Sequence, residues 1–289
     1  MTNRYRPMAI AANATSAWRQ ALFTALQGDE VSPRGKEVRE ILGYTTRIGM
    51  AFPVVTDMLR KLNYRFMFAE AAWILGGRND VGYLTKFNPH MAQFSDDGEA
   101  LAGAYGIPFT EQLDFVVRKL KEDRDTRQAT MTLWRPNPAP SKDIPCTVAL
   151  DFKIRDNLLV TQVFMRSSDV WLGLPYDIFA FSMMSYRVIE RLHELGGEPV
   201  VPGALLITAA SSHLYSQHYT VAAEVAKDYV TMELMGDFRS TAPPALYDPA
   251  LRHLNHPRSL LSWLNWLAEG PKNDRWWGKS AGASHAPVA

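Results

Sequence analysis

Two β-rich segments that follow each other without an intervening helix constrain the fold of this sequence most. Residues 147–167, TVALDFKIRDNLLVTQVFMRS, are rich in β-branched side chains and contain a turn signal at Asp156-Asn157, so they predict two strands joined by a turn. Strictly alternating strands and helices would instead predict a doubly wound parallel sheet. The consecutive strands predict an α/β (α+β) protein whose central sheet is mixed, mostly antiparallel and backed by helices.

The remaining pattern supplies the other elements. Helices are predicted at 1–30, 58–77, 110–123, 174–195 and 218–230, strands at 45–55, 129–134 and 203–219, and a loop-rich insert at 79–106. Composition does not divide the chain, so we expect a single domain over residues 1–289.

Charge and cysteine content exclude several classes of function. The 31 Lys and Arg balance 30 Asp and Glu, so the net charge of +1 gives no field that favours nucleic acid or an anionic membrane. No apolar run approaches the ~20 residues of a membrane span, and no signal-peptide core occurs, which predicts a cytoplasmic protein. One cysteine, Cys146, excludes an internal disulfide and a cysteine-rich zinc site, and no other metal site is indicated.

Cys146 is the first candidate for chemistry, because a thiolate is the strongest nucleophile among side chains. It follows Pro145 at the end of a long polar loop and precedes a predicted strand. Arginines elsewhere in the chain would lower its pKa if they lie nearby. The alternative is a buried structural thiol, which is the commoner fate of a lone cysteine.

Arginines on separate segments predict a focused anion site. Arg166 ends a strand beside Ser167, and together they offer donors suited to a phosphate or carboxylate. Further candidates for the same anion are Arg34, Arg124 and Arg127. The alternatives are a surface ion pair between Arg166 and Asp169, and a solvated charge run at 123–127.

Other polar residues stand in apolar surroundings. Glu70 interrupts an apolar helix, so we expect burial and a raised pKa suited to an acid or base, unless it faces solvent. His213 and Tyr215 lie two residues apart at a strand end and share one face, within reach of a sugar hydroxyl. Asp177 stands where a Gly-Leu-Pro turn enters a buried helix, so it either caps that helix or contacts a ligand.

Taken together, these motifs resemble the thymidylate synthase superfamily over roughly residues 31–220. The family's Phe-Pro strand and glutamate helix are matched by FPVVTDMLRKLNYRFMFAEAAWILGG, and its tyrosine segment is matched by AYG. Its nucleophile segment resembles IPC, and its Arg-Ser-x-Asp signature resembles MRSSDVWLGLPYDI. Its His-x-Tyr sugar clamp resembles SSHLYSQH, and its C-terminal tail resembles the final APVA. The resemblance implies a thymidylate synthase-like fold. It also implies catalytic roles for Cys146, Glu70, Asp177 and Tyr105.

The resemblance further implies ligands and a partner. The ligands would be a pyrimidine nucleoside monophosphate and 5,10-methylenetetrahydrofolate, bound by a homodimer that shares arginines across its interface. The phosphate and sugar would be held by Arg34, Arg166, Ser167, His213 and Tyr215 of one subunit and Arg127 of the other. The folate would be held by Asp169, Leu172, Gly173, Tyr176, Met91 and Phe94. Gln128 stands where the family usually has another arginine.

Two departures from the synthases alter the expected reaction. Synthases that methylate deoxyuridylate have asparagine where this chain has Asp177, and the superfamily's deoxycytidylate hydroxymethylases have aspartate. A protonated carboxylic acid offers an O–H to N3 and a C=O to the C4 amine of cytosine. Met91 and Phe94 replace two tryptophans of the folate wall, which would admit water. The resemblance therefore implies hydroxymethylation of dCMP.

Four alternatives stay open. They are reductive methylation of dCMP, which the APVA tail favours, hydroxymethylation of CMP, thymidylate synthesis from dUMP, and a noncatalytic nucleotide- or nucleic-acid-binding relative. Retention of Cys146, Glu70 and Arg166 opposes the last of these. A cytidylate enzyme of this kind would suggest a bacteriophage with modified DNA or an antibiotic pathway.

Overall fold

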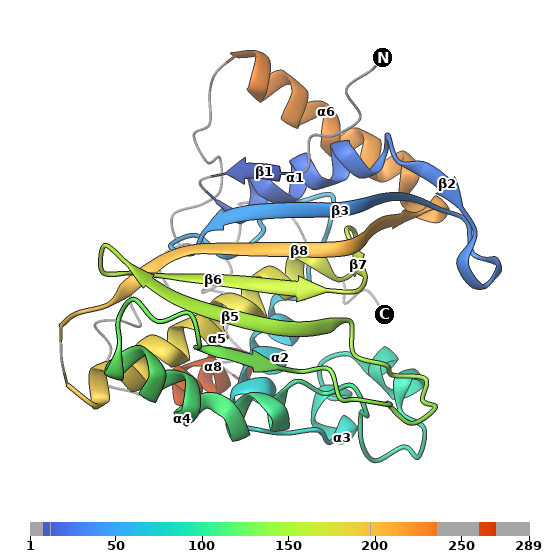
Figure 1. Ribbon diagram of the computed structural model, residues 1–289. Helices are drawn as coiled ribbons and strands as arrows, with labels where there is room; N and C mark the ends of the chain where they lie inside the picture. Colours follow the sequence, from blue (N-terminus) through green and yellow to red (C-terminus); the bar gives the residue numbers. More distant parts are fainter. Residues whose placement is uncertain (1–7, 12, 197, 236–259, 270–289) are drawn as a thin grey trace.

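The computed structural model describes residues 8–11, 13–196, 198–235 and 260–269. Within these ranges one sheet has the strand order β1-β3-β8-β6-β5-β4, with β2 paired to β3 and β7 paired to β8 (Figure 1). Four of its strand pairings are antiparallel and three are parallel. The predicted mixed, mostly antiparallel sheet backed by helices is therefore confirmed.

The elements have the following bounds. The strands are β1 (Met8–Ala11), β2 (Asp29–Val31), β3 (Val38–Gly49), β4 (Thr130–Thr132), β5 (Thr147–Arg155), β6 (Leu158–Met165), β7 (Ser168–Asp169) and β8 (Val201–Tyr215). The helices are α1 (Ala14–Ala25), α2 (Tyr64–Leu75), α3 (Val81–Leu84), α4 (Gly106–Glu122), α5 (Leu174–Glu194), α6 (Tyr219–Met235) and α8 (Leu260–Glu269). Short 3₁₀ turns are η1 (Pro33–Gly35), η2 (Pro89–Phe94) and η3 (Ser216–His218).

The β5–β6 hairpin forms as predicted. Its turn residues Asp156 and Asn157 have φ values of 51° and 61°, the left-handed conformation that a two-residue hairpin turn requires and that Asp and Asn tolerate. Along β6, Leu159, Val163 and Met165 are buried, so one face of the hairpin turns toward the core.

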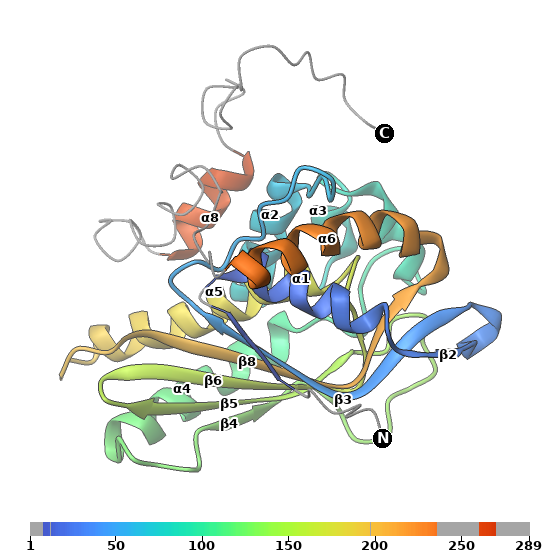
Figure 2. The ribbon, with the colours of Figure 1, turned by 90° about the horizontal axis from the view of Figure 1, so that it is seen from above.

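Helices cover one face of the sheet. Figure 2 shows α1, α2, α5 and α6 on the same side of β3 and β8. The hydroxyls of Thr161 on β6 and Ser185 on α5 share a hydrogen bond of 2.8 Å inside this layer. Burying a side chain such as Phe181 of α5 stabilises the fold by ~1.5–3 kcal/mol, so the α5–sheet contact anchors the first turn of α5.

Two predicted helices have different starts. The helix predicted at 1–30 is wrong at residues 8–11, which form β1. Helix α1 begins at Ala14, where the Asn13 side chain accepts the Ser16 N–H. The helix predicted at 58–77 begins only at Tyr64, where the Asn63 side chain accepts the Phe66 N–H at 3.0 Å. Such side-chain acceptors terminate the preceding turn and fix the helix start.

Two further findings concern the chain ends and the surface. In the part of the chain that the structure describes, no helix is long and apolar enough to cross a membrane. The APVA segment, predicted to resemble the family's C-terminal tail, lies outside the described residues.

Candidate active site

Cys146 lies immediately before β5, at the junction between a polar loop and the sheet. Its carbonyl accepts the Arg166 N–H at 2.8 Å, which joins it to the end of β6. The Arg166 guanidinium donates from Nε to the Pro145 carbonyl and from Nη2 to the Ile144 carbonyl, each at 2.9 Å. Arg166 thereby holds the backbone that delivers the thiol.

The electrostatic surroundings of Cys146 are mixed. Burial raises the pKa of the thiol, the positive charges of Arg166 and Arg34 oppose this, and the negative charges of Asp177 and Asp143 reinforce it. Because the net direction is upward, the sequence-based expectation that arginines would lower the pKa of this thiol describes only part of the balance. The thiol is therefore protonated at neutral pH in the protein alone.

Two exposed cations face this region. Arg34 lies in η1 with φ of 55°, and its charge acts on both Cys146 and His213. Among the described residues neither Arg34 nor Arg166 forms an ion pair, so the alternative of a bridge from Arg166 to Asp169 is not found. Both guanidinium groups keep N–H donors for an anion.

Glu70 of α2 and Asp177 of α5 form a pair of interacting carboxyl groups. Burial, and then the charge of Asp177, raise the pKa of Glu70 to about 8. Burial, and then the charge of Asp169, raise the pKa of Asp177 to about 7. Neither carboxyl group has a hydrogen-bond partner within the described ranges, which is unusual for partly buried carboxyls and typical of ligand sites.

Asp177 does not cap its helix. The N-cap of α5 is Gly173, whose carbonyl accepts the Asp177 N–H at 3.0 Å, and no capping hydrogen bond comes from a side chain. A carboxylate in the first turn of a helix normally gains from the helix dipole, yet the pKa of Asp177 is raised. The capping interpretation is therefore wrong.

The raised carboxyl pKa values predict how stability depends on pH. The folded protein keeps protons on Asp177 and Glu70 that the unfolded chain releases above its ordinary values of 3.8 and 4.5. The free energy of unfolding therefore falls as the pH rises from about 4 to about 8. We expect Asp177→Asn to match the wild type near pH 4 and to exceed it at pH 8, by on the order of 2–4 kcal/mol. Urea unfolding at both pH values tests this, and an equal difference at both would contradict it.

Tyr105 and Thr147 lie beside Cys146. The Tyr105 ring stacks on Phe181 at a centroid distance of 6.2 Å. Burial, followed by the charges of Asp177 and Cys146, raises the pKa of Tyr105 well above its usual range. Thr147 was missed by the sequence analysis, although it follows Cys146 directly. Its side chain is fully buried, and Tyr105 is its hydrogen-bonding neighbour.

His213 and Tyr215 share one face of β8, as predicted. Their rings meet edge to face at 5.3 Å. The β7–β8 pairing sets His213 opposite Asp169. Burial lowers the pKa of His213, and the Asp169 charge opposes this. Burial raises the pKa of Asp169, whose Oδ1 accepts the N–H groups of Trp171 and Leu172 at 2.8 Å each. The other oxygen of Asp169 has no partner within the described residues.

The predicted folate residues lie on two segments. Leu172 and Gly173 form the turn before α5, and Leu172 is 45% exposed. Tyr176 accepts the Asn63 N–H at 3.1 Å through its hydroxyl. Met91 and Phe94 lie in η2, where Met91 packs against the core and Phe94 is 41% exposed. Leu172 and Gly173 therefore lie beside Asp169, whereas no contact within the described ranges joins Met91 or Phe94 to that carboxyl.

Two predicted phosphate residues differ in placement. Ser167 is partly buried and directly follows Arg166. Arg127 is exposed on the loop between α4 and β4, and its charge is not among those that act on Cys146. Arg124, by contrast, is engaged with Asn157 at 2.7 Å and with Glu198 at 3.8 Å. Charge and ring interactions link Cys146 to a set of predicted residues that comprises Arg34, Glu70, Tyr105, Arg166, Asp169, Asp177, His213 and Tyr215. No contact within the described ranges joins Met91, Phe94 or Arg127 to this set.

Comparison with known proteins agrees with this arrangement. The sequence model of the family described as Thymidylate synthase matches residues 24–234. The chain is also 34% identical over 236 residues to a protein of Bacillus phage SP01 named "Deoxyuridylate hydroxymethyltransferase". That match covers 74% of this chain and 60% of the relative, so the chain spans less than two thirds of the relative's length.

Proposed function

Because this chain belongs to the thymidylate synthase family, we propose that it transfers one carbon to C5 of a cytosine nucleotide and converts dCMP into 5-hydroxymethyl-dCMP. Family membership supports one-carbon transfer to a pyrimidine nucleotide. The name of the phage relative supports a hydroxymethyl product. The choice of base rests on this chain's own Asp177.

The unpartnered carboxyl of Asp177 is the observation that carries the proposal. With a pKa of about 7, it exists in both protonation states at neutral pH. One proton shared between this carboxyl and N3 satisfies cytosine, while the second oxygen accepts from the C4 amine. Uracil presents O4 instead of the amine, and because O4 is far less basic than cytosine N3, the uracil complex loses the proton once the carboxyl ionises. The protonated acid alone would accommodate uracil, so discrimination increases as the carboxyl ionises.

A second candidate substrate is dUMP. The specific observation in its favour is the name of the phage relative, which refers to deoxyuridylate. Its weakness is chemical, because dUMP would meet Asp177 without a donor for O4 whenever the carboxyl is ionised. The assay below includes both nucleotides for this reason.

The proposed binding roles follow the geometry. Arg34, Arg166 and Ser167 hold the phosphate, since both guanidinium groups have free N–H donors. His213 and Tyr215 hold the sugar from their shared face. A further phosphate contact comes from Arg127 of the partner subunit in a homodimer, because Arg127 is exposed and makes no described contact with Cys146 in its own chain.

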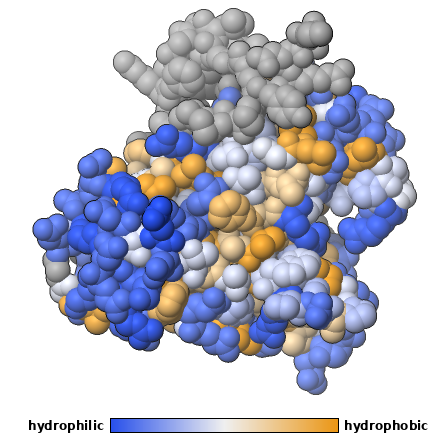
Figure 3. All heavy atoms as spheres, in the orientation of Figure 1, coloured by the Kyte–Doolittle hydropathy of each residue, from blue (hydrophilic) through white to orange (hydrophobic). Residues whose placement is uncertain are grey.

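The bare face of the sheet supports a homodimer. Phe164 of β6 is 44% exposed on this face, and Leu42 of β3 is 68% exposed. The same view in space-filling form shows apolar and neutral residues across the middle of the molecule, with hydrophilic residues on both sides (Figure 3). Exposed apolar side chains of this kind favour a protein partner, and a second copy of the chain would bring an arginine with it.

The chemical roles assigned to the chain's residues are as follows. Bound 5,10-methylenetetrahydrofolate supplies the carbon. Cys146 adds to C6 of the base and makes C5 nucleophilic. Asp177 supports this step by sharing a proton with N3. Glu70, with a pKa of about 8, holds a water and moves its proton. Met91 and Phe94 line the folate side and leave room for that water.

Removing one phosphate arginine tests the anion site. We expect Arg34→Ala to raise the KM for dCMP by roughly 10- to 100-fold, because charge-assisted hydrogen bonds are worth about 1.5–3 kcal/mol. The turnover number should change less than the KM. Arg124→Ala is the matched control, since Arg124 is already bound to Asn157 and Glu198 and should leave the KM within about twofold. Equal KM values for the two variants would count against the site.

Product mass tests the function as a whole. The protein is incubated with 5,10-methylenetetrahydrofolate and, separately, with dCMP, dUMP and CMP. We expect a hydroxymethyl gain on dCMP together with tetrahydrofolate. A methyl gain with dihydrofolate would replace the proposal with reductive methylation, and turnover of dUMP alone would overturn the role of Asp177. Turnover of CMP in preference to dCMP would assign the ribonucleotide as the substrate.

A further inference from the structure

Two loops on one side of Cys146 are tied together by carboxylates. We name residues 134–145, which lead into Cys146, the nucleophile loop. Asp96 belongs to the 79–106 insert and accepts the Ser141 hydroxyl at 2.6 Å and the Lys142 N–H at 3.1 Å. In return, Asp143 of the nucleophile loop accepts the Gly103 N–H at 2.8 Å. Each loop therefore supplies one aspartate that accepts hydrogen bonds from the other loop.

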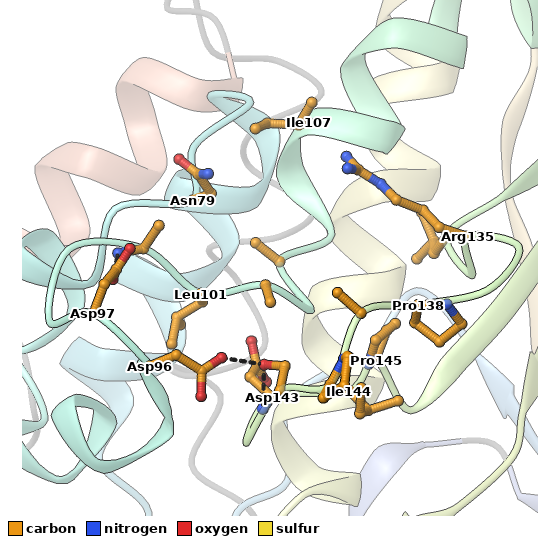
Figure 4. Close-up of a pocket in the computed structure, with 17 residues that line it drawn as sticks. Asn79, Asp96, Asp97, Leu101, Ile107, Arg135, Pro138, Asp143, Ile144 and Pro145 are labelled. Carbon is orange, nitrogen blue, oxygen red and sulfur yellow. Dashed lines mark hydrogen bonds between the residues drawn. The ribbon is translucent and has the colours of Figure 1, made fainter.

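A cavity of about 390 Å³ lies between these loops. Its apolar lining includes Leu101 of the insert and Pro138 and Ile144 of the nucleophile loop (Figure 4). Figure 4 also shows Asp96 and Asp143 near each other in the wall, with Arg135 across the cavity. Because the nucleophile loop borders open space here, close packing does not fix its position on this side. Hydrogen bonds must do so.

Gly103 shows how closely the loops approach. A Cβ atom at this position would lie 2.7 Å from the Asp143 carbonyl oxygen and 3.0 Å from the Pro145 nitrogen. Both are backbone atoms, so a larger residue would displace the loop. The approach that allows the Gly103–Asp143 hydrogen bond therefore depends on glycine.

We propose that Asp96 and Asp143 are positioning residues, which hold the nucleophile loop so that the Cys146 thiol meets C6 of the pyrimidine. Arg166 holds the loop from the other side through the carbonyls of Ile144 and Pro145. The inference rests on Cys146 as the nucleophile of the proposed function. It does not depend on which pyrimidine is the substrate.

The two properties of Asp143 can be separated by substitution. Its oxygen holds Gly103, and its negative charge is one of the influences that raise the pKa of Cys146. Asn at position 143 keeps an oxygen for the Gly103 N–H and removes the charge, whereas Ala removes both. Asn at position 96 likewise keeps an acceptor for Lys142 and a partner for Ser141, and Ala keeps neither.

The test compares Asp96→Asn, Asp96→Ala, Asp143→Asn and Asp143→Ala, with Glu99→Ala as an exposed acidic control in the same insert. The nucleotide is whichever one the product assay shows to be turned over. We expect both alanine variants to lose about 10- to 100-fold in kcat with KM within about threefold, since a misplacement of ~1 Å has an effect of this size. The asparagine variants should stay within about threefold of the wild type.

Alkylation gives a readout that needs no substrate. The rate of Cys146 alkylation by iodoacetamide, followed against pH, should shift to lower pH in Asp143→Asn, because a negative charge is removed. Wild-type kcat in both alanine variants would overturn the proposal. So would equal losses in Asp143→Asn and Asp143→Ala. If the alanine variants do not fold, Gly103→Ala replaces them, and unchanged kcat in that variant would also overturn it. If the pH dependence of alkylation shifts but dCMP, dUMP and CMP are not turned over, the proposed function fails while the link between Asp143 and Cys146 is retained.

Discussion

Cys146→Ser is expected to lower turnover by about 10³-fold or more, the scale seen when a covalent nucleophile is removed. Serine is close in size, and the backbone hydrogen bond from Arg166 does not involve the side chain, so the fold should persist. A hydroxyl is a far weaker nucleophile than a thiol unless a base activates it. Within the described residues no hydrogen bond joins Asp177 or Glu70 to the Cys146 side chain, so a serine there has no base beside it.

The measurement is steady-state turnover of dCMP, paired with calorimetric binding of dCMP. Binding should stay within about threefold of the wild type, because the phosphate and base contacts remain. A serine variant that kept more than about a tenth of the turnover would refute the assignment of Cys146 as the nucleophile.

Asp177→Asn is expected to reverse the preference for the base. A flipped amide would pair with both atoms of cytosine, but it has no acidic proton to share with N3. In the orientation that suits uracil, the amide nitrogen faces the C4 amine of cytosine and the amide oxygen faces N3, so both contacts are unsatisfied. Each unsatisfied partner costs about 1–3 kcal/mol, which lowers kcat/KM for dCMP by roughly 10- to 100-fold. For dUMP the amide offers a donor to O4 and an acceptor to N3–H, so kcat/KM should rise by a similar factor.

Competition assays with equal dCMP and dUMP measure this ratio directly. Asp156→Asn, which makes the same chemical change in the exposed β5–β6 turn, is the matched control and should leave the ratio unchanged. A variant at position 177 that retained the wild-type ratio would show that another residue selects the base.

The sequence predicted the parts of this fold that local pattern encodes. The β5–β6 hairpin carries its own turn residues, and α5 has a long apolar face, so both could be placed from sequence. The start of α2 also had a local signal, the Asn63 cap, which an apolar pattern over a longer segment obscured. Strand β1 had none, because its four residues depend on pairing with β3.

Site residues could be predicted from the sequence where their polarity differed from that of their neighbours. Glu70 and Asp177 were found because a carboxyl amid apolar neighbours is costly, and the structure raises the pKa of both. Asp96 and Asp143 escaped notice because their partners lie about 40 residues away or more, across two loops. Such contacts depend on tertiary packing, which no local pattern specifies. Thr147 escaped because its contact with Tyr105 also depends on tertiary packing.

The exposed sheet face with Phe164 and Leu42 has a consequence for how the amount of enzyme relates to its activity. If two copies meet on this face and exchange Arg127, each catalytic centre is complete only while the pair is associated. Dilution would then separate the subunits by mass action and weaken phosphate capture before it affected the nucleophile. The activity of each enzyme molecule would therefore rise with the local concentration of the protein. A higher expression level would increase both the number of enzyme molecules and the activity of each one.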